Sequence, residues 1–115
     1  MIDSRSKGAR GEREAAAKMR ELGFPGARRG QQFAGGPDSP DLADVIEGVH
    51  VEVKRVESLS LYKAMAQAIA DAGPVAIPTI LHKRNGREWL VVLRADDLIE
   101  FCRRTLYAQQ RAEDL

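Results

Sequence analysis

One stretch decides the fold that we predict for this chain: Asp41–Lys54, which reads DLADVIEGVHVEVK. From residue 49 to residue 56, apolar and polar side chains alternate with a period of two. This pattern is typical of a strand whose successive side chains point to opposite faces of a sheet. The valines of this strand therefore share one face, and the polar side chains share the other, namely His50, Glu52 and Lys54.

The residues before this strand, Leu42–Ile46, indicate a partner strand, and a Glu-Gly pair supplies a tight turn between the two. Such a hairpin brings an aspartate, Asp41 or Asp44, close to Glu52. We choose Asp41 because a strand start follows it directly and because ten residues suffice for the return to Glu52. Asp38 also follows a proline and stays an alternative, as does Asp44.

Carboxylates and a lysine that converge from neighbouring strands form a site for a divalent cation and a phosphodiester. Mg²⁺ takes one or two protein carboxylates, keeps several waters and binds phosphate oxygens. The ammonium group of Lys54 would stabilise the charge that develops on phosphorus or orient the attacking water. The alternative is a strand face that simply meets water.

A helix is predicted from Ser6 to Leu22, and Gly23 ends it. Glu12 precedes Ala15 and Ala16 by three and four residues, so it lies on the apolar stripe of this helix, which comprises Ala15, Ala16, Met19 and Leu22. A carboxylate on a buried face needs a partner, and the cation is one candidate. The alternative is a first-turn glutamate that is favoured by the helix dipole and points to solvent.

The rest of the chain predicts the other elements of an α/β sandwich. In chain order they are a short strand Ala27–Phe33, a loop Ala34–Pro40, the hairpin described above, a helix from Ser60 to Ala72, strands Val75–Leu81 and Glu88–Leu93, and a helix from about Asp96 past Tyr107. Asn85-Gly86 is a strong turn signal between the last two strands. The order αβββαββα places helices around a central mixed sheet.

Charge is distributed unevenly along a chain whose composition is otherwise ordinary. The 115 residues are 43% hydrophobic and 30% charged, which is typical of one soluble globular domain, and the net charge of +1 does not argue for nucleic acid. Residues 1–29 hold eight Lys or Arg against four acids, whereas residues 30–53 hold five acids and no Lys or Arg. A basic flank beside an acidic pocket suits a metal-dependent enzyme that acts on a polyanion, although a chance imbalance on a solvated surface is the alternative.

Several classes of site are excluded by residue counts. Cys102 is alone, so the chain forms no internal disulfide or cysteine zinc site. His50 and His82 lack the spacing of a helical zinc motif. The sequence shows no signal peptide and no membrane-spanning run, so we expect no membrane partner and a cytoplasmic location, including a host cytoplasm if the gene is viral.

Two sequence blocks resemble a known family. Pro40-Asp41, followed after ten residues by Glu52-Val53-Lys54, resembles the signature of the PD-(D/E)XK nucleases. The run Lys7–Glu14 resembles the opening of archaeal and phage Holliday junction resolvases in that superfamily. The resemblance covers about residues 6 to 95.

The resemblance implies a restriction-endonuclease-like αβββαβ core in a single domain, residues 1–115, and a Mg²⁺-dependent endodeoxyribonuclease that resolves four-way or other branched double-stranded DNA. Mn²⁺ is a possible substitute for Mg²⁺. A symmetric junction needs two coordinated cuts, so we expect a two-fold homodimer, and the final helix is apolar on more than one stripe, as a protomer contact requires. The alternatives are a restriction-like or repair-like endonuclease and a catalytically inactive DNA-binding protein.

The resemblance also assigns roles to residues of this chain. Metal binding is assigned to Asp41 and Glu52, with Glu12 completing or orienting the metal shell, and catalysis to these three residues together with Lys54. Arg28 would grip a substrate phosphate, although an exposed basic pair is equally consistent with the sequence. Gln67 is a further candidate on the second helix, with an ordinary exposed amide as the alternative. The residues expected to contact DNA are Lys7, Arg10, Arg13, Arg28 and Arg29.

Overall fold

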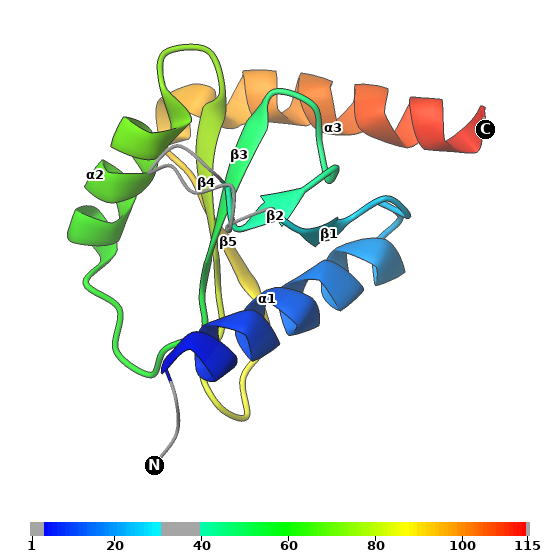
Figure 1. The fold of residues 1–115 in the computed structure, drawn as a ribbon. Helices are drawn as coiled ribbons and strands as arrows, with labels where there is room; N and C mark the ends of the chain where they lie inside the picture. The colour runs from blue at the N-terminus through cyan, green and yellow to red at the C-terminus, as the bar shows by residue number, and fades with distance from the viewer. Residues whose placement is uncertain (1–3, 31–39, 115) are drawn as a thin grey trace.

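Five strands form one mixed sheet, and their spatial order follows the chain, β1-β2-β3-β4-β5 (Figure 1). The computed structural model describes residues 4–30 and 40–114 of the chain. The elements in these residues are α1 (Ser4–Glu21), β1 (Arg28–Arg29), β2 (Leu42–Ala43), β3 (Val49–Lys54), α2 (Leu61–Ala72), β4 (Ile77–His82), β5 (Leu90–Val92), the short 3-10 helix η2 (Ala95–Asp97) and α3 (Leu98–Glu113). The predicted order of helices and strands is confirmed.

The strand pairing makes the sheet mixed, as the sequence predicts. β1, β2 and β3 are antiparallel neighbours, with Leu42 opposite Val51 in the predicted hairpin. β4 lies parallel to β3, with Ile80 level with Glu52. Parallel neighbours cannot be joined by a tight turn, so α2 makes the crossover between them. β5 is antiparallel to β4 and forms the far edge of the sheet.

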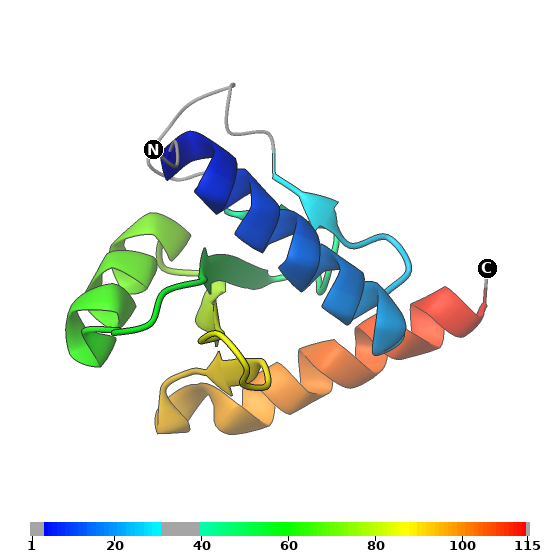
Figure 2. The ribbon, with the colours of Figure 1, turned by 90° about the horizontal axis from the view of Figure 1, so that it is seen from below.

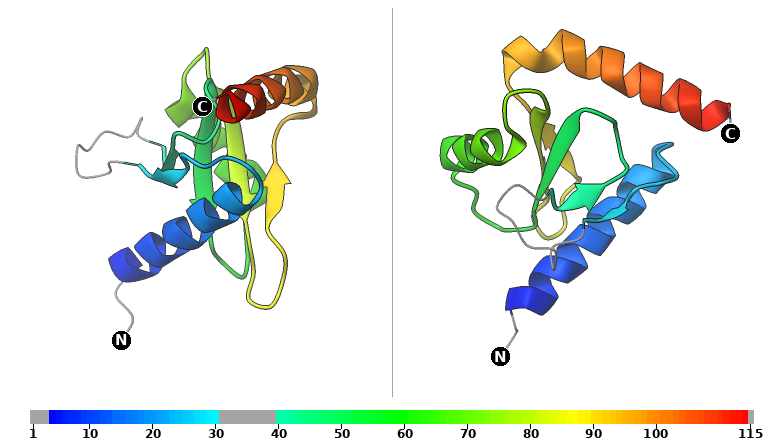
Figure 3. Two further views of the ribbon diagram at one scale, coloured as in Figure 1. Left: turned by 90° about the vertical axis from the view of Figure 1, so that its right-hand side faces the viewer. Right: turned by 45° about the horizontal axis from the view of Figure 1, so that its top comes forward.

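The helices lie in two layers, which confirms the α/β class. Figure 2 shows α2 on one side of the sheet, and α1 with α3 on the other. Figure 3 shows α1 and α3 crossing that same face at different heights. Met65 and Ala68 of α2 are buried against Ile80. The opposite face carries the larger cluster, which comprises Ala15, Ala16, Met19, Phe24, Ala27, Leu42, Val45, Ile46, Val51 and Leu81.

The alternation of β3 decides which helix layer each of its side chains meets. Val51 belongs to the cluster beneath α1 and α3, as does Leu81 on the neighbouring strand. Residues level with one another on parallel strands point to the same face, so Glu52 shares the α2 face with Ile80. The polar side chains of β3 therefore lie on the α2 face of the sheet, as the period of two predicts: His50, Glu52 and Lys54.

Several predicted boundaries are wrong for a local reason. The strand predicted for Leu42–Ile46 ends at Ala43, because Asp44 adopts a φ of +59°, which is incompatible with an extended strand. Leu22, predicted to belong to the apolar stripe of the first helix, is 51% exposed because it lies just beyond the end of α1. The predicted strand from Val75 begins at Ile77.

Part of the predicted first strand and most of the following loop, with Asp38, fall within residues 31–39, outside the described residues.

α3 is attached to the sheet by a polar contact. The guanidinium of Arg104 donates hydrogen bonds to the carbonyl oxygens of Gly48, at 2.5 Å, and Val75, at 3.1 Å. These two residues precede β3 and β4, so α3 crosses the beginnings of both central strands. Among the residues that the structure describes, no helix has the length and apolar character needed to span a bilayer.

α1 approaches the sheet closely at Gly11. A Cβ atom placed there would lie 2.8 Å from the Cβ of Arg55, which directly follows β3. The Arg55 Cβ cannot move away without its backbone, so only glycine allows this approach. At Gly8, one turn earlier, a Cβ would meet no atom within 4 Å. Gly11 therefore sets the distance between β3 and the helix turn that carries Glu12.

We expect Gly11→Ala to lower the free energy of unfolding by about 1–3 kcal/mol, because overpacking outweighs the gain in helix propensity. The matched variant Gly8→Ala should raise it by about 0.5–1 kcal/mol, since alanine is the better helix former. Urea denaturation followed by circular dichroism measures both values. Equal stabilisation by the two substitutions would contradict the close approach of α1.

Candidate functional site

Asp41 and Glu52 come together where β2 meets β3. Backbone bonds fix Asp41, since its N–H donates to the Val51 carbonyl and its carbonyl accepts from Gly30, both at 2.9 Å. A side chain at Gly30 would collide with the carbonyl of Pro40, so this close approach of the two chain segments also requires glycine. The Asp41 carboxylate accepts the Val53 N–H at 2.7 Å, and a side-chain hydrogen bond joins it to Glu52.

Asp41 is half-buried and Glu52 is buried, and two acids in contact at such a position cannot both carry an uncompensated charge. Burial, followed by the negative charge of Glu52, raises the pKa of Asp41 from 3.8 to about 7, although the Val53 N–H opposes this shift. The side-chain bond to Glu52 and the charge of Glu12 raise it further. The pair therefore holds a proton near neutral pH or requires a cation in its place.

Glu12 approaches this pair from α1. It is buried with the apolar stripe of the helix, which confirms its predicted position. Its carboxylate accepts a hydrogen bond from Arg29 Nε at 2.8 Å, and its charge acts on Asp41. Arg29 thus supplies one of the partners that a buried carboxylate requires, and Glu12 links α1 to β1 beside the acidic pair.

His50 and Lys54 flank Glu52 on the same face of β3. The Nε2 atom of His50 lies 2.8 Å from Oε1 of Glu52, and both residues are buried. Lys54 is half-buried, and its Cα lies two strand rises from that of Glu52, about 6.5–7 Å. Within residues 4–30 and 40–114, the Lys54 ammonium makes no hydrogen bond or ion pair.

The predicted phosphate-binding residues are divided by the structure. Arg10 and Arg13 are exposed on α1, on the helix that carries Glu12. Arg28 pairs with exposed Asp44 at 2.8 Å, so of the two neighbouring arginines it is Arg29 whose side chain reaches the acidic group. The side chain of Lys7 lies outside the described residues. Because β1 has only two residues, its sequence contains no alternating pattern that would indicate which arginine faces the site.

Two other candidates point elsewhere. Gln67 is exposed, and its amide donates to Asp71 one helical turn away, at 3.0 Å. Asp44, an alternative to Asp41, is held by Arg28 on the surface. The structure brings neither residue into the group around Glu52.

An ion-pair network that the sequence did not indicate holds α1 beside the site. The carboxylate of Glu14 lies 3.0 Å from Arg55 Nε and 3.5 Å from Lys83 Nζ. Arg55 follows β3 and Lys83 follows β4. The network therefore ties the helix of Glu12 to the ends of both central strands, although nothing in the local sequence pairs these residues.

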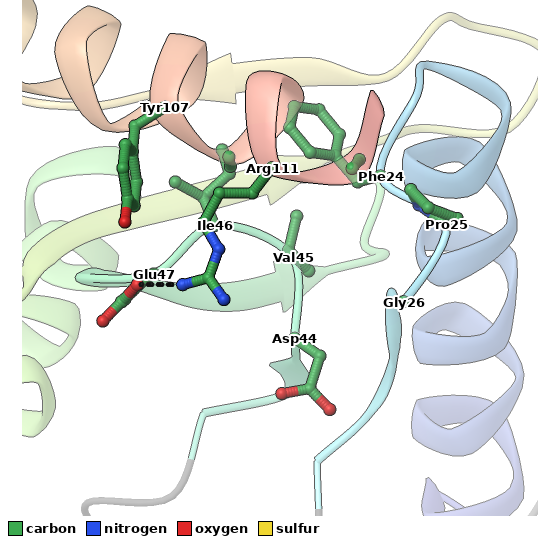
Figure 4. Close-up of a pocket in the computed structure, with 11 residues that line it drawn as sticks. Phe24, Pro25, Gly26, Asp44, Val45, Ile46, Glu47, Tyr107 and Arg111 are labelled. Atoms are coloured by element: carbon green, nitrogen blue, oxygen red, sulfur yellow. Dashed lines mark ion pairs between the residues drawn. The ribbon is translucent and has the colours of Figure 1, made fainter. Parts of the chain in front are cut away.

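A separate hollow of about 650 Å³ lies between α3 and the β2–β3 connection (Figure 4). Phe24, Val45 and Ile46 line it, and Tyr107 stands at its side in the close-up. Its charged groups are already paired: Glu47 with Arg111 at 3.7 Å, and Asp44 with Arg28. The acidic pair, by contrast, contains an aspartate whose pKa is strongly raised by burial, so chemistry favours that site.

The acidic pair fits a hard divalent cation that keeps most of its waters. Among the residues that the structure describes, no three His, Cys, Asp or Glu side chains form a ready-made metal cluster. Mg²⁺ needs only one or two protein carboxylates. Asp41 and Glu52 meet that requirement, whereas Glu12 already accepts a hydrogen bond from Arg29.

Comparison of the chain with known protein families, with curated proteins and with solved structures found no match. What the site can do therefore follows from its own residues. These are two carboxylates in contact, a lysine on the same strand face and exposed arginines on the adjoining helix.

The pKa of Asp41 predicts how stability depends on pH. Because it is raised in the folded protein, the fold binds an extra proton between pH 3.8 and about 7, and metal-free stability falls as pH rises through this range. From pH 5 to pH 8, the free energy of unfolding of the wild type should fall. We expect that of Asp41→Asn to fall by roughly 1–2 kcal/mol less.

Urea denaturation at each pH in the presence of EDTA measures this difference. Asp44→Asn, at an exposed aspartate, is the control and should follow the wild-type profile. Parallel profiles for Asp41→Asn and the wild type would contradict the shared burial of the two acids.

Proposed function

We propose that this protein is a Mg²⁺-dependent DNA endonuclease of the PD-(D/E)XK type that cleaves four-way or otherwise branched double-stranded DNA. The observation that carries the proposal is the contact of Asp41 with Glu52, with Lys54 on the same strand face. The element order supports it too, since α1, β1–β3, α2 and β4 match the αβββαβ core of the nucleases that the sequence resembles.

Each residue of the site has a separate task. Asp41 and Glu52 would hold Mg²⁺, or Mn²⁺ in its place. Glu12, which accepts a hydrogen bond from Arg29, would orient the groups around the ion. Bound there, the ion would polarise the phosphodiester and lower the pKa of a water. Lys54 donates a hydrogen bond to the phosphate or to the attacking water, where developing negative charge makes that bond stronger.

The DNA backbone is held by exposed basic residues beside the site. Arg10 and Arg13 extend from α1, and Lys7 belongs to the same helix. Cationic side chains bind backbone phosphates without regard to base sequence, which suits recognition by DNA shape. Arg28 would join them only when its pair with Asp44 opens, since that pair now occupies it.

Other functions fit less well. A DNA-binding protein without catalysis would have no use for two acids in contact, one half-buried and one buried, that repel phosphate unless a cation neutralises them. A restriction-like or repair-like endonuclease would use the same residues on a different DNA. Linear, flapped and four-way DNA of matched length separate these substrate classes in one cleavage assay.

We expect Glu52→Gln to reduce Mg²⁺-dependent cleavage by about 10² or more while DNA binding persists, because the lost charge acts mainly in the transition state. Gel-based cleavage and binding assays on the three DNA forms measure both quantities. Glu21→Gln is the matched control, since Glu21 is an exposed acid at the end of α1. Full cleavage by Glu52→Gln would remove this carboxylate from the reaction.

We further propose that two copies assemble through α3, so that two sites act on one junction. α3 exposes large apolar side chains, each more than half exposed: Leu98, Ile99, Leu106 and, beside the hollow, Tyr107. Burying such side chains against a second copy would favour assembly by roughly 25 cal/mol per Å² of apolar surface.

Leu106→Glu should convert a dimer into a monomer, because it places a charge at this contact. Analytical ultracentrifugation measures the mass, and Tyr62→Glu, at an exposed apolar residue of α2 on the other side of the sheet, is the control. A wild-type monomer that resolves junctions with full activity at the assay concentration would overturn the proposed assembly.

A further inference from the structure

His50 is a buried titratable residue to which the sequence gave no task. Its exposed fraction is 6%, and that of Glu52 is 8%. On the neighbouring strand, Pro78 lies level with His50 and Ile80 with Glu52, and neither side chain has a hydrogen-bonding group. Both polar groups are thus largely removed from water, and each depends on partners within the protein.

The contact between them has a defined direction. Nε2 of His50 lies 2.8 Å from Oε1 of Glu52, a hydrogen-bond distance for a ring nitrogen and a carboxylate oxygen. An ionised Glu52 only accepts hydrogen bonds, and toward it the imidazole donates from Nε2. Glu52 also bonds to Asp41, so its carboxyl group is held from two sides.

We propose that His50 is a positioning residue, whose Nε2–H holds Glu52 turned toward Asp41 so that both carboxyl groups face one divalent cation. The inference rests on the cation of the proposed function and assigns a residue that orients its ligand. Without this bond, the three side-chain torsions of Glu52 would be free to carry its carboxylate away from Asp41. Groups that orient a metal ligand in this way typically change metal affinity by about 10-fold to 100-fold.

A purely structural role is the competing explanation, and His82 provides a matched control for it. His82 is also buried, on the adjacent strand, and its Nε2 bonds the backbone carbonyl of Val56 rather than a carboxylate. Removing either imidazole takes away a buried hydrogen bond and should lower stability. Only the loss of His50 should change how Glu52 is presented to a metal.

The test measures Mn²⁺ binding to the full chain without DNA, from the free Mn²⁺ signal in electron paramagnetic resonance. We expect His50→Leu to weaken Mn²⁺ binding by about 10-fold to 100-fold. His50→Gln, whose amide nitrogen can replace Nε2 as donor, should remain within about threefold of the wild type. His82→Leu should bind Mn²⁺ as the wild type does. Should His50→Leu fail to fold, His50→Asn takes its place, because the shorter amide cannot reach Glu52.

Cleavage supplies a second readout. In His50→Leu the Mn²⁺ concentration needed for half-maximal rate should rise, and saturating Mn²⁺ should restore most of kcat. Unchanged affinity in His50→Leu, equal losses in His50→Leu and His82→Leu, or no Mn²⁺ binding by the wild type would each overturn the inference. The expected affinities in a protein that cleaves none of the DNAs would leave the inference standing and remove the proposed nuclease.

Discussion

The structure depends on placing two acids side by side where water is largely excluded. Burial and the charge of Glu52 raise the pKa of Asp41 to about 7, so the pair weakens the fold unless a proton or a cation neutralises it. The surrounding residues offset part of this cost. The Val53 N–H bonds Asp41, His50 bonds Glu52, and Arg29 bonds Glu12. Locally unfavourable groups supported from several sides are typical of functional sites.

The scaffold fixes these acids with central strands and with close contacts of helix α1. Glu52 lies in the middle of β3, between β2 and fully buried β4. Gly11 lets α1 come close to Arg55, and Glu14 ties the same helix to Arg55 and Lys83. Glu12 directly follows Gly11, where α1 approaches Arg55 most closely, and is thereby held in place. A site built on such elements keeps its geometry better than one built on loops.

Sequence patterns predicted the parts of the site that depend on local repeats. The period of two placed His50, Glu52 and Lys54 on one face, and the helical period placed Glu12 on the buried stripe. The ten-residue return brought Asp41 to Glu52. The same patterns could not choose between Arg28 and Arg29, because β1 has only two residues. They also gave no partner for Glu14, because its partners lie 41 and 69 positions away.

The sequence by itself determined the order of elements, the α/β class and the face of β3 that carries the polar residues, because these follow from the periods of helix and strand. Only the tertiary structure decided three further points. α2 covers this face, Asp44 pairs with Arg28 on the surface, and His50 contacts Glu52 where both are buried. Contacts between elements depend on how the elements pack and on which charges lose their water, and no local period encodes either.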